Sequence, residues 1–263
     1  MPFTCCKPVV WASDLLDGFG DQLLVIFPIS RLQNAAMADD TTAPPATAGP
    51  TDTPPDAISL RAPSRYPADT SKGSPALSES FVAPPNEWLA GTWTVTHSTL
   101  SMWRSAQNVR ITYTPRTPSS PSDDHGPAVN DNIVEYEKKN GKGGVHSVLG
   151  VEKPDPNVPG AWNWRGKGWL VIASSHWEIL GWGERPLPGG EGVERWAVTW
   201  FAPTLFTEEG VDLYSSRPEG LDEKTADDIV KALRKLRAPK LVRLVEEKMM
   251  EVAINLPWEE ASN

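Results

Sequence analysis

Four polar side chains could do acid–base or hydrogen-bonding chemistry, because each lies in a stretch of alternating apolar residues: His97, Tyr113, Glu178 and Arg195. In an apolar pocket a tyrosine hydroxyl or an arginine can hold a carbonyl group, and an imidazole or a carboxyl group can exchange a proton. These four residues are therefore the candidate catalytic groups. Whether they can act on a bound molecule depends on whether each side chain points into a pocket or toward solvent.

The alternation of the chain predicts the facing of two of them. His97 shares one face of its segment with Trp93 and Val95, and Tyr113 shares a face with Ile111. If these faces point inward, Tyr113 is the polar tip of an apolar cavity. His97 is then either a structural histidine whose two nitrogens are hydrogen-bonded, or a ligand-orienting group, a general acid/base or a haem ligand.

Glu178 has the opposite parity to Trp177 within its segment. Because one parity must face solvent, we expect Glu178 on the solvent side. If that strand is flipped, Glu178 is a buried carboxyl group with a raised pKa, which is typical of an acid/base catalyst.

Tryptophan is unusually frequent, with 12 residues in the chain, ten of them between Trp88 and Trp200. Such rings either fill a core or line a flat pocket for a conjugated or polycyclic ligand. The candidate ligand-binding residues are those that parity places on inward faces: Trp93, Val95, His97, Ile111, Tyr113, Trp164, Trp177, Trp196 and Trp200.

The elements that must position these residues are strands. Period-two alternation predicts strands over about 93–99, 109–114, 133–138, 145–151, 161–173, 175–183, 193–202 and 211–216. No helical pattern separates them, so the sheet must be antiparallel. About eight strands at this spacing favour a closed barrel or a sandwich, and an eight-stranded barrel has room for a filled core or one small ligand.

A helical tail follows the strands. Asp222 can cap one helix and Pro239 can begin a second, each with a single apolar stripe. We expect both helices to pack on the barrel wall or on each other, with binding of a partner protein as the alternative.

The residues Gly91-Thr92-Trp93 at the first strand resemble the Gly-x-Trp signature of the lipocalins, within the calycin group. The resemblance covers about half of the chain. It implies that Trp93 closes the base of the barrel, with Gly91 before it and Arg217 lying across it in a cation–π contact. The chain also looks like intracellular fungal lipocalin-like proteins found beside secondary-metabolism genes, some of which are stereoselective cyclases, including Diels–Alderases.

Composition divides the chain into four expected segments. We expect a poorly ordered extension over 1–40, a disordered Pro/Thr/Ala-rich linker over 41–85, a barrel over 86–218 and packed helices over 219–258. The fold class is thus mainly β, an eight-stranded antiparallel lipocalin-like barrel with a C-terminal helical segment and a disordered N-terminal region. Met37 is an alternative start to Met1.

Charge and motifs exclude several functions. The net charge is −9 without a Lys/Arg stripe, which argues against nucleic acid and anionic membranes as partners. Cys5 and Cys6 are the only cysteines, so the folded part has no disulfide framework or Cys-type zinc site, and we expect a cytoplasmic protein. Phosphate-binding loops and a Gly-x-Ser-x-Gly elbow are missing from the sequence, and we expect no metal and no cofactor, haem included.

Three functions remain open. The first is an intracellular protein that binds a small apolar or aromatic molecule. The second is a cofactor-free cyclase or isomerase, resembling the Diels–Alderases, that uses the same pocket. The third is a protein-interaction scaffold.

Overall fold

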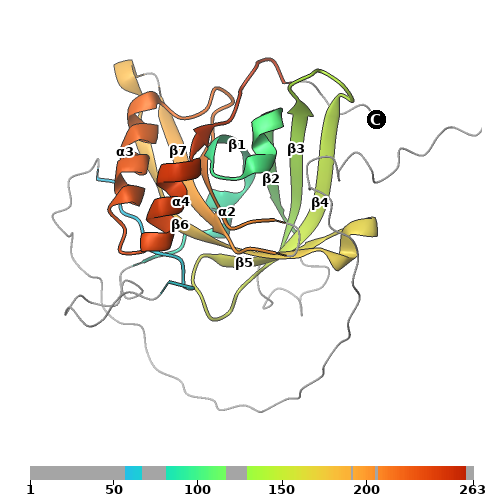
Figure 1. Ribbon diagram of the computed structural model, residues 1–263, viewed down its shortest axis with the longest axis horizontal. Helices are drawn as coiled ribbons and strands as arrows, with labels where there is room; N and C mark the ends of the chain where they lie inside the picture. The colour runs from blue at the N-terminus through green and yellow to red at the C-terminus, as the bar shows by residue number, and fades with distance from the viewer. Residues whose placement is uncertain (1–56, 67–80, 117–128, 191, 205–206, 259–263) are drawn as a thin grey trace, which may run out of the picture. The chain divides into compact units, whose positions relative to one another are not determined.

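The computed structural model describes residues 57–66, 81–116, 129–190, 192–204 and 207–258 (Figure 1). The predicted N-terminal extension over 1–40 lies outside the described residues, as do 41–56 and 67–80 of the predicted linker.

Eight antiparallel strands form a closed barrel, as the sequence predicts. Each strand pairs with the next along the chain, and the last, β8, pairs with β1 to close the ring. The strands are β1 (Gly91–Ser98), β2 (Ala106–Pro115), β3 (Asn130–Lys138), β4 (Val145–Pro154), β5 (Ala161–Gly166), β6 (Ser174–Pro186), β7 (Val193–Phe201) and β8 (Gly210–Ser215).

The connections follow local turn chemistry. Between β3 and β4, Gly141 and Gly144 have φ angles of 68° and 62°, a conformation that residues with a Cβ atom rarely adopt. In the same turn, the Asn140 side chain accepts a hydrogen bond from the Lys142 amide at 3.0 Å. The strand expected over 161–173 is shorter than predicted. It ends at Gly166 and is followed by the short 3-10 helix η3 (Gly168–Ile172).

One end of the barrel is closed by the short helix α2 (Asn86–Leu89), which precedes β1. Reciprocal amide hydrogen bonds of 3.0 and 2.8 Å join Asn86 to Asn130 at the start of β3. The Trp93 indole donates to the Leu89 carbonyl at 2.7 Å. These contacts hold the helix across the barrel end. The β6–β7 connection, which contains η4 (Pro188–Gly190), lies at this same end, and η2 (Ser101–Ser105) joins β1 to β2 at the opposite end.

The two C-terminal helices cover the outside of the barrel, and Figure 1 shows them side by side next to β6 and β7. The helix α3 (Glu223–Arg234) begins after Asp222, whose carboxylate accepts a hydrogen bond from the Lys224 amide at 3.1 Å. The helix α4 (Pro239–Lys248) has Pro239 in its first turn, as predicted. Their apolar stripes are buried against outward-facing side chains of β7 and β8, in a second core outside the barrel.

The segment after α4 fills a gap in the wall. β2 pairs only with the first half of β1, and the two-residue strand β9 (Met250–Glu251) pairs with the second half. The Val252 amide then donates to the Thr96 carbonyl, and the Asn108 amide donates to the Ala253 carbonyl at 2.8 Å. Residues 250–253 therefore bridge the place where β1 and β2 separate.

Residues 58–66, here called the strap, run along the outside of β6. The Arg61 amide donates to the Leu180 carbonyl at 2.8 Å, and Leu60 packs on the outer core. This corrects the expectation of disorder over 41–85 at these positions. The Pro- and Ala-rich composition suggested a segment that could not bury apolar surface, but the barrel wall supplies the surface against which it packs.

Candidate ligand-binding site in the barrel

A bulge in β1 reverses the facing of His97. Val95 pairs with Tyr214, but after the bulge His97 pairs with Leu213, a residue of the outer core. His97 therefore lies outside the barrel, and the prediction that it shares the face of Trp93 and Val95 is wrong. An extra residue in one strand shifts the parity of everything after it. Burial lowers the pKa of His97, and Glu251 and Asp227 partly oppose that shift.

The side chains of β7 also face the opposite way from the prediction: those expected to point into the barrel point outward. Trp196 pairs with Ser215 and Trp200 with Val211, and both indoles belong to the outer core beneath the C-terminal helices. Neither lines the lumen. The more apolar face of this strand was expected to point inward, yet the helices make the outer surface the more apolar one.

The contact predicted between Arg217 and Trp93 is made by Arg195 instead. The Arg195 guanidinium lies 5.0 Å from the centre of the Trp93 ring and 5.6 Å from that of Trp88, and it donates to the Trp88 carbonyl at 2.8 Å. Arg217 lies near Glu194, at 3.7 Å. Arg195 is thus part of the closed end, which leaves it poorly placed to act at the other end of the lumen.

The other predicted pocket residues face inward as expected. Cross-strand pairing and the inner core place them on the lumenal side: Trp93, Val95, Ile111, Tyr113, Trp164 and Trp177. Whether any of them contacts a ligand stays a prediction.

Two buried carboxyl groups that the sequence reasoning missed lie beside Tyr113. Asp212 and Tyr214 of β8 and Glu152 of β4 point into the barrel, and all three interact electrostatically with Tyr113. We call Tyr113, Glu152, Asp212 and Tyr214 the acid–tyrosine cluster. Each of its side chains is at most 3% exposed.

Burial changes the ionisation of this cluster. It raises the pKa of Glu152 to about 8, against a smaller effect of the hydrogen bond from the Trp177 indole. Burial likewise raises the pKa of Asp212 to about 7, although hydrogen bonding from Ser98 and from the Trp103 indole opposes it. The pKa values of Tyr113 and Tyr214 rise well above the usual range, chiefly through burial. Near neutral pH Glu152 and the two tyrosines are therefore largely protonated, whereas Asp212 is divided between its protonated and ionised forms.

One polar atom of this cluster, Glu152 Oε2, has no hydrogen-bond partner among the described residues. The Trp103 indole instead interacts with Asp212, and the Tyr214 hydroxyl with Tyr113 and Thr199. A buried polar group without a partner costs about 1–3 kcal/mol, so native structures rarely leave one unsatisfied. Glu152 Oε2 is therefore the atom of the cluster that water or a small molecule would satisfy.

Toward the end opposite α2, several inward-facing side chains are only partly buried, and we call them the rim: Val134, Tyr136, His146, Val148, Trp164 and Phe201. The Tyr136 ring stacks on His146 with centres 5.2 Å apart, and Trp103 packs at 5.6 Å from Tyr136. The rim is thus largely aromatic, and the acid–tyrosine cluster lies deeper.

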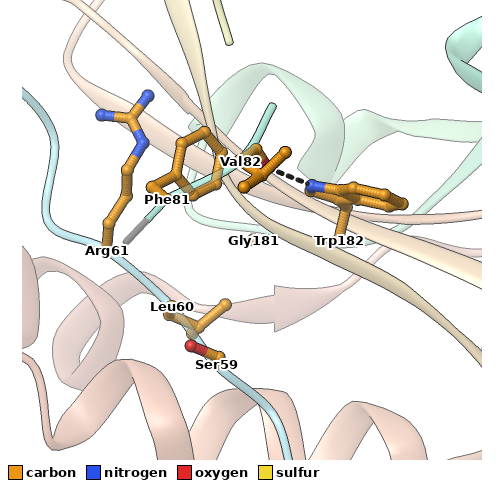
Figure 2. Close-up of a pocket in the computed structure, with 7 residues that line it drawn as sticks. All are labelled: Ser59, Leu60, Arg61, Phe81, Val82, Gly181 and Trp182. Atoms are coloured by element: carbon orange, nitrogen blue, oxygen red, sulfur yellow. Dashed lines mark hydrogen bonds between the residues drawn. The ribbon is translucent and has the colours of Figure 1, made fainter. Parts of the chain in front are cut away.

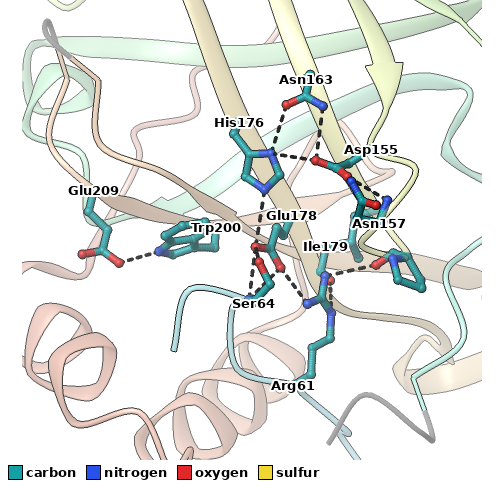
Figure 3. A network of polar contacts seen from close by, with 11 residues as sticks. Arg61, Ser64, Asp155, Asn157, Asn163, His176, Glu178, Ile179, Trp200 and Glu209 are labelled. Atoms are coloured by element: carbon teal, nitrogen blue, oxygen red, sulfur yellow. Dashed lines mark hydrogen bonds and ion pairs between the residues drawn. The ribbon is translucent and has the colours of Figure 1, made fainter. Parts of the chain in front are cut away.

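Glu178 faces outward, as its parity predicted, but it is buried rather than solvated. Figure 3 shows its carboxylate under the strap, where Arg61 donates to it at 2.6 Å and the Ser64 amide at 3.0 Å. His176 lies 3.5 Å away and also contacts Asp155. Because Glu178 has partners for both oxygens, this network is best explained as the fastening of the strap.

Two hollows lie outside the lumen. One, of about 210 Å³, lies between the strap and β6; Figure 2 shows the Trp182 indole donating to the Val82 carbonyl beside it, and Gly181 behind. The other, of about 250 Å³, includes Pro154, Gly160 and Trp162. Neither of these two hollows is lined by Glu152, Asp212 or Tyr113.

Metal and membrane features can be judged for the described part of the chain. It contains no group of three or more His, Cys, Asp or Glu side chains placed to hold a metal ion, and the expectation that no cofactor is bound stays a prediction. Its helices are all too short or too polar to cross a bilayer.

The closed eight-stranded ring, the Trp93 base and the helix after the last strand define the architecture. The fold is a lipocalin-like (calycin) barrel. Solved structures with a similar course include apocrustacyanin C1, which is 12% identical over 77% of this chain and 94% of that chain with a TM-score of 0.45. Another is H1 crustacyanin from the lobster Homarus americanus, at 11% identity, coverage of 78% and 94%, and a TM-score of 0.41.

Among curated proteins, this lipocalin-like chain is similar to botcinic acid biosynthesis cluster B protein 12 of Botryotinia fuckeliana (strain B05.10). The two are 25% identical over 173 residues, which are 64% of this chain and 74% of the relative. No protein-family model matches the chain.

Proposed function

We propose that the lipocalin-like barrel binds a small, mostly apolar molecule in its lumen. The observation that carries this proposal is a closed barrel with a largely aromatic, partly buried rim and, deeper inside, a buried carboxyl group whose Oε2 has no partner among the described residues. The rim would bury the apolar body of the ligand at about 25 cal/mol per Å² of surface removed from water. The acid–tyrosine cluster would hold its polar end, which is the usual division of labour in small-molecule sites.

A pair of neighbouring substitutions on β4 tests the proposal. Val148 pairs with Val134 and faces the lumen, whereas Leu149 pairs with Ile133, faces outward and is 46% exposed. Wild-type protein should bind the neutral dye Nile red saturably, and Val148→Trp should weaken that binding by about tenfold or more. Leu149→Trp adds the same ring to the outer surface and should leave it unchanged. Absent dye binding, or equal effects of both variants, would sink the proposal.

Catalysis in the same lumen is a second candidate, favoured by the acid–tyrosine cluster. Carboxyl groups with pKa values of about 7 and 8 can act as acids near neutral pH. A cofactor-free cyclisation or isomerisation needs shape, one or two hydrogen-bond donors and exclusion of water. The similarity to a protein of a biosynthesis cluster is compatible with such a role.

The two candidates differ in what the producing organism would make. Replacing the native gene with an Asp212→Asn, Glu152→Gln version removes both acids while conserving size. If the protein is a catalyst, a precursor isomeric with the final product should accumulate, as it would in a deletion strain. If it is a carrier, the products should keep their identity and change only in amount, measured by mass spectrometry of extracts.

A further inference from the structure

One of the two hollows outside the lumen lies at the closed end of the barrel, and we call it the end hollow. It has a volume of about 250 Å³ and lies between the residues around α2 and the loop that joins β4 to β5. Three of its lining residues belong to the inner core: Leu89, Trp162 and Ile179, each at most 7% exposed. The end hollow therefore gives access to apolar side chains that are otherwise covered.

The rest of its lining is also largely apolar. Among the described residues that line the end hollow, the only ones with an amide or a charged side chain are Asn86 and Asp155. The others are small or aliphatic residues of the two loops: Ala83, Pro84, Pro154, Val158, Pro159, Gly160 and Ala161.

The polar groups around the end hollow already have partners. Asn86 exchanges hydrogen bonds of 3.0 and 2.8 Å with Asn130. The Asp155 carboxylate accepts from the backbone amide two residues later at 2.9 Å, and the Gly160 carbonyl accepts from the Ile179 amide at 2.8 Å. No side chain in the described lining has a buried polar atom without a partner. A molecule in the end hollow would therefore be held by apolar contact, and its own polar groups would find no free partner.

Arg61 of the strap links the two loops that form the end hollow. Its guanidinium donates to the Pro159 carbonyl at 3.2 Å and lies 4.5 Å from the centre of the Phe81 ring, beside which Figure 2 shows it. The Phe81 ring in turn packs on Gly160, where a Cβ atom would lie only 3.0 Å from the ring. These contacts fix the loops relative to each other, so little ordering of the protein is needed when a molecule binds.

We propose that the end hollow is a second binding site, which takes a single aromatic ring with a small alkyl or halogen substituent. An apolar cavity of about 150 Å³ is enough to hold benzene, so a substituted ring fits the larger volume here. The site is independent of the proposed function, because it lies outside the lumen and shares no residue with the rim or the acid–tyrosine cluster.

Titration of the full chain with toluene tests the proposal. We expect saturable shifts of the carbon-13 methyl resonances of Ala83, Val158 and Ala161, with a dissociation constant of about 1 mM or lower. Ala83→Phe places a ring in the end hollow and should weaken toluene binding about tenfold or more. Val82→Phe is the matched control, because Val82 is 75% exposed and lines the other hollow, and it should leave the affinity unchanged.

A second filling variant keeps the test decisive if Ala83→Phe does not fold. Val158→Phe enters the end hollow from the β4–β5 loop and should weaken toluene binding to a similar extent. Benzyl alcohol, which is close to toluene in size, should bind at least about threefold more weakly, because its hydroxyl has no free partner there. Equal binding of the two molecules would overturn the preference for apolar substituents.

The lumen variant Val148→Trp separates the end hollow from the lumen. It should leave toluene binding unchanged, while it weakens the binding of Nile red. If toluene shifts no methyl group of the end hollow, or if Val148→Trp weakens toluene binding and the folded filling variants do not, the second site is refuted. Either result leaves the proposed function of the lumen intact, and failure of Nile red to bind would leave the end hollow intact.

Discussion

The indole nitrogen of Trp177 donates to Glu152 Oε1 at 3.2 Å, while Oε2 of the same carboxyl group has no partner among the described residues. One oxygen of this buried carboxyl group is thus held by a side chain of the barrel wall, and the other oxygen has no such contact. The arrangement orients Glu152 without neutralising it, and it leads to a prediction about stability.

The free energy of unfolding should fall as the pH rises. Glu152 and Asp212 have folded pKa values of about 8 and 7, above their ordinary values of 4.5 and 3.8, so the folded state binds protons more tightly. The stabilising effect is complete below about pH 4 and is lost as the pH rises through 7 and 8, by about 1.4 kcal/mol per unit for each group. Urea unfolding across this range should show it.

The variant Glu152→Gln, Asp212→Asn provides the comparison for that measurement, because it should flatten the pH dependence. His97 acts in the opposite sense, since its pKa is lowered in the folded state. The difference between wild type and variant is therefore the quantity to evaluate. Parallel curves would contradict the assignment of these two pKa values.

Ser98→Ala should raise the pKa of Asp212 further. The Ser98 hydroxyl donates to the Asp212 carboxylate and favours its ionised form, so its removal makes the proton harder to lose. His97→Ala is the matched control, because the adjacent residue faces the other side of the wall. Carbon-13 NMR titration of the Asp212 carboxyl carbon would measure both, and an equal response to the two substitutions would exclude the assigned facing.

Arg61→Ala should cost about 3–5 kcal/mol of unfolding free energy, because it leaves the buried Glu178 carboxylate without its cation. Arg116→Ala breaks an ion pair with Asp131 whose side chains are 44% and 38% exposed, and should cost less than about 1 kcal/mol. Urea unfolding compares them. Adding Glu178→Gln to Arg61→Ala should recover part of the loss; similar costs for both arginines would mean that the strap is not fastened there.

Arg195→Ala should destabilise the closed end by on the order of 2 kcal/mol, through the lost cation–π contact and the lost hydrogen bond to Trp88. Arg195→Lys keeps the charge without the planar group and should be intermediate. The near-ultraviolet circular dichroism of Trp88 and Trp93 should change in both variants. In Arg217→Ala that signal should persist, and its loss there would restore the original assignment.

Much of the fold could be predicted from sequence because it depends on local periodicity. The alternation around Trp93 and Tyr113 indicated strands, and Asp222 and Pro239 marked the helices. These signals need only neighbouring residues. The closure of the ring followed from strand number and spacing.

The candidate site was harder to predict because it depends on facing. A bulge after Val95 turns the His97 side chain to the outside of the barrel. The residue types of β1 do not indicate that this bulge is present. Asp212 alternates with Val211 and Leu213, and a charged residue between apolar neighbours is typical of a solvent-facing position, so the pattern gives no sign of a buried acid. The helices cover that outer face, and the polar residue points inward. Only the tertiary packing of the tail on the wall decides which face is which.

The seam between β1 and β2 is sealed by residues that come after every other element. Val252, Ala253 and Asn255 supply the backbone groups that bond Thr96 and Asn108, about 150 residues earlier in the chain. The barrel wall between β1 and β2 therefore cannot be completed until residues 250–255 have been synthesised, so the last step in closing the wall depends on contacts of high sequence separation.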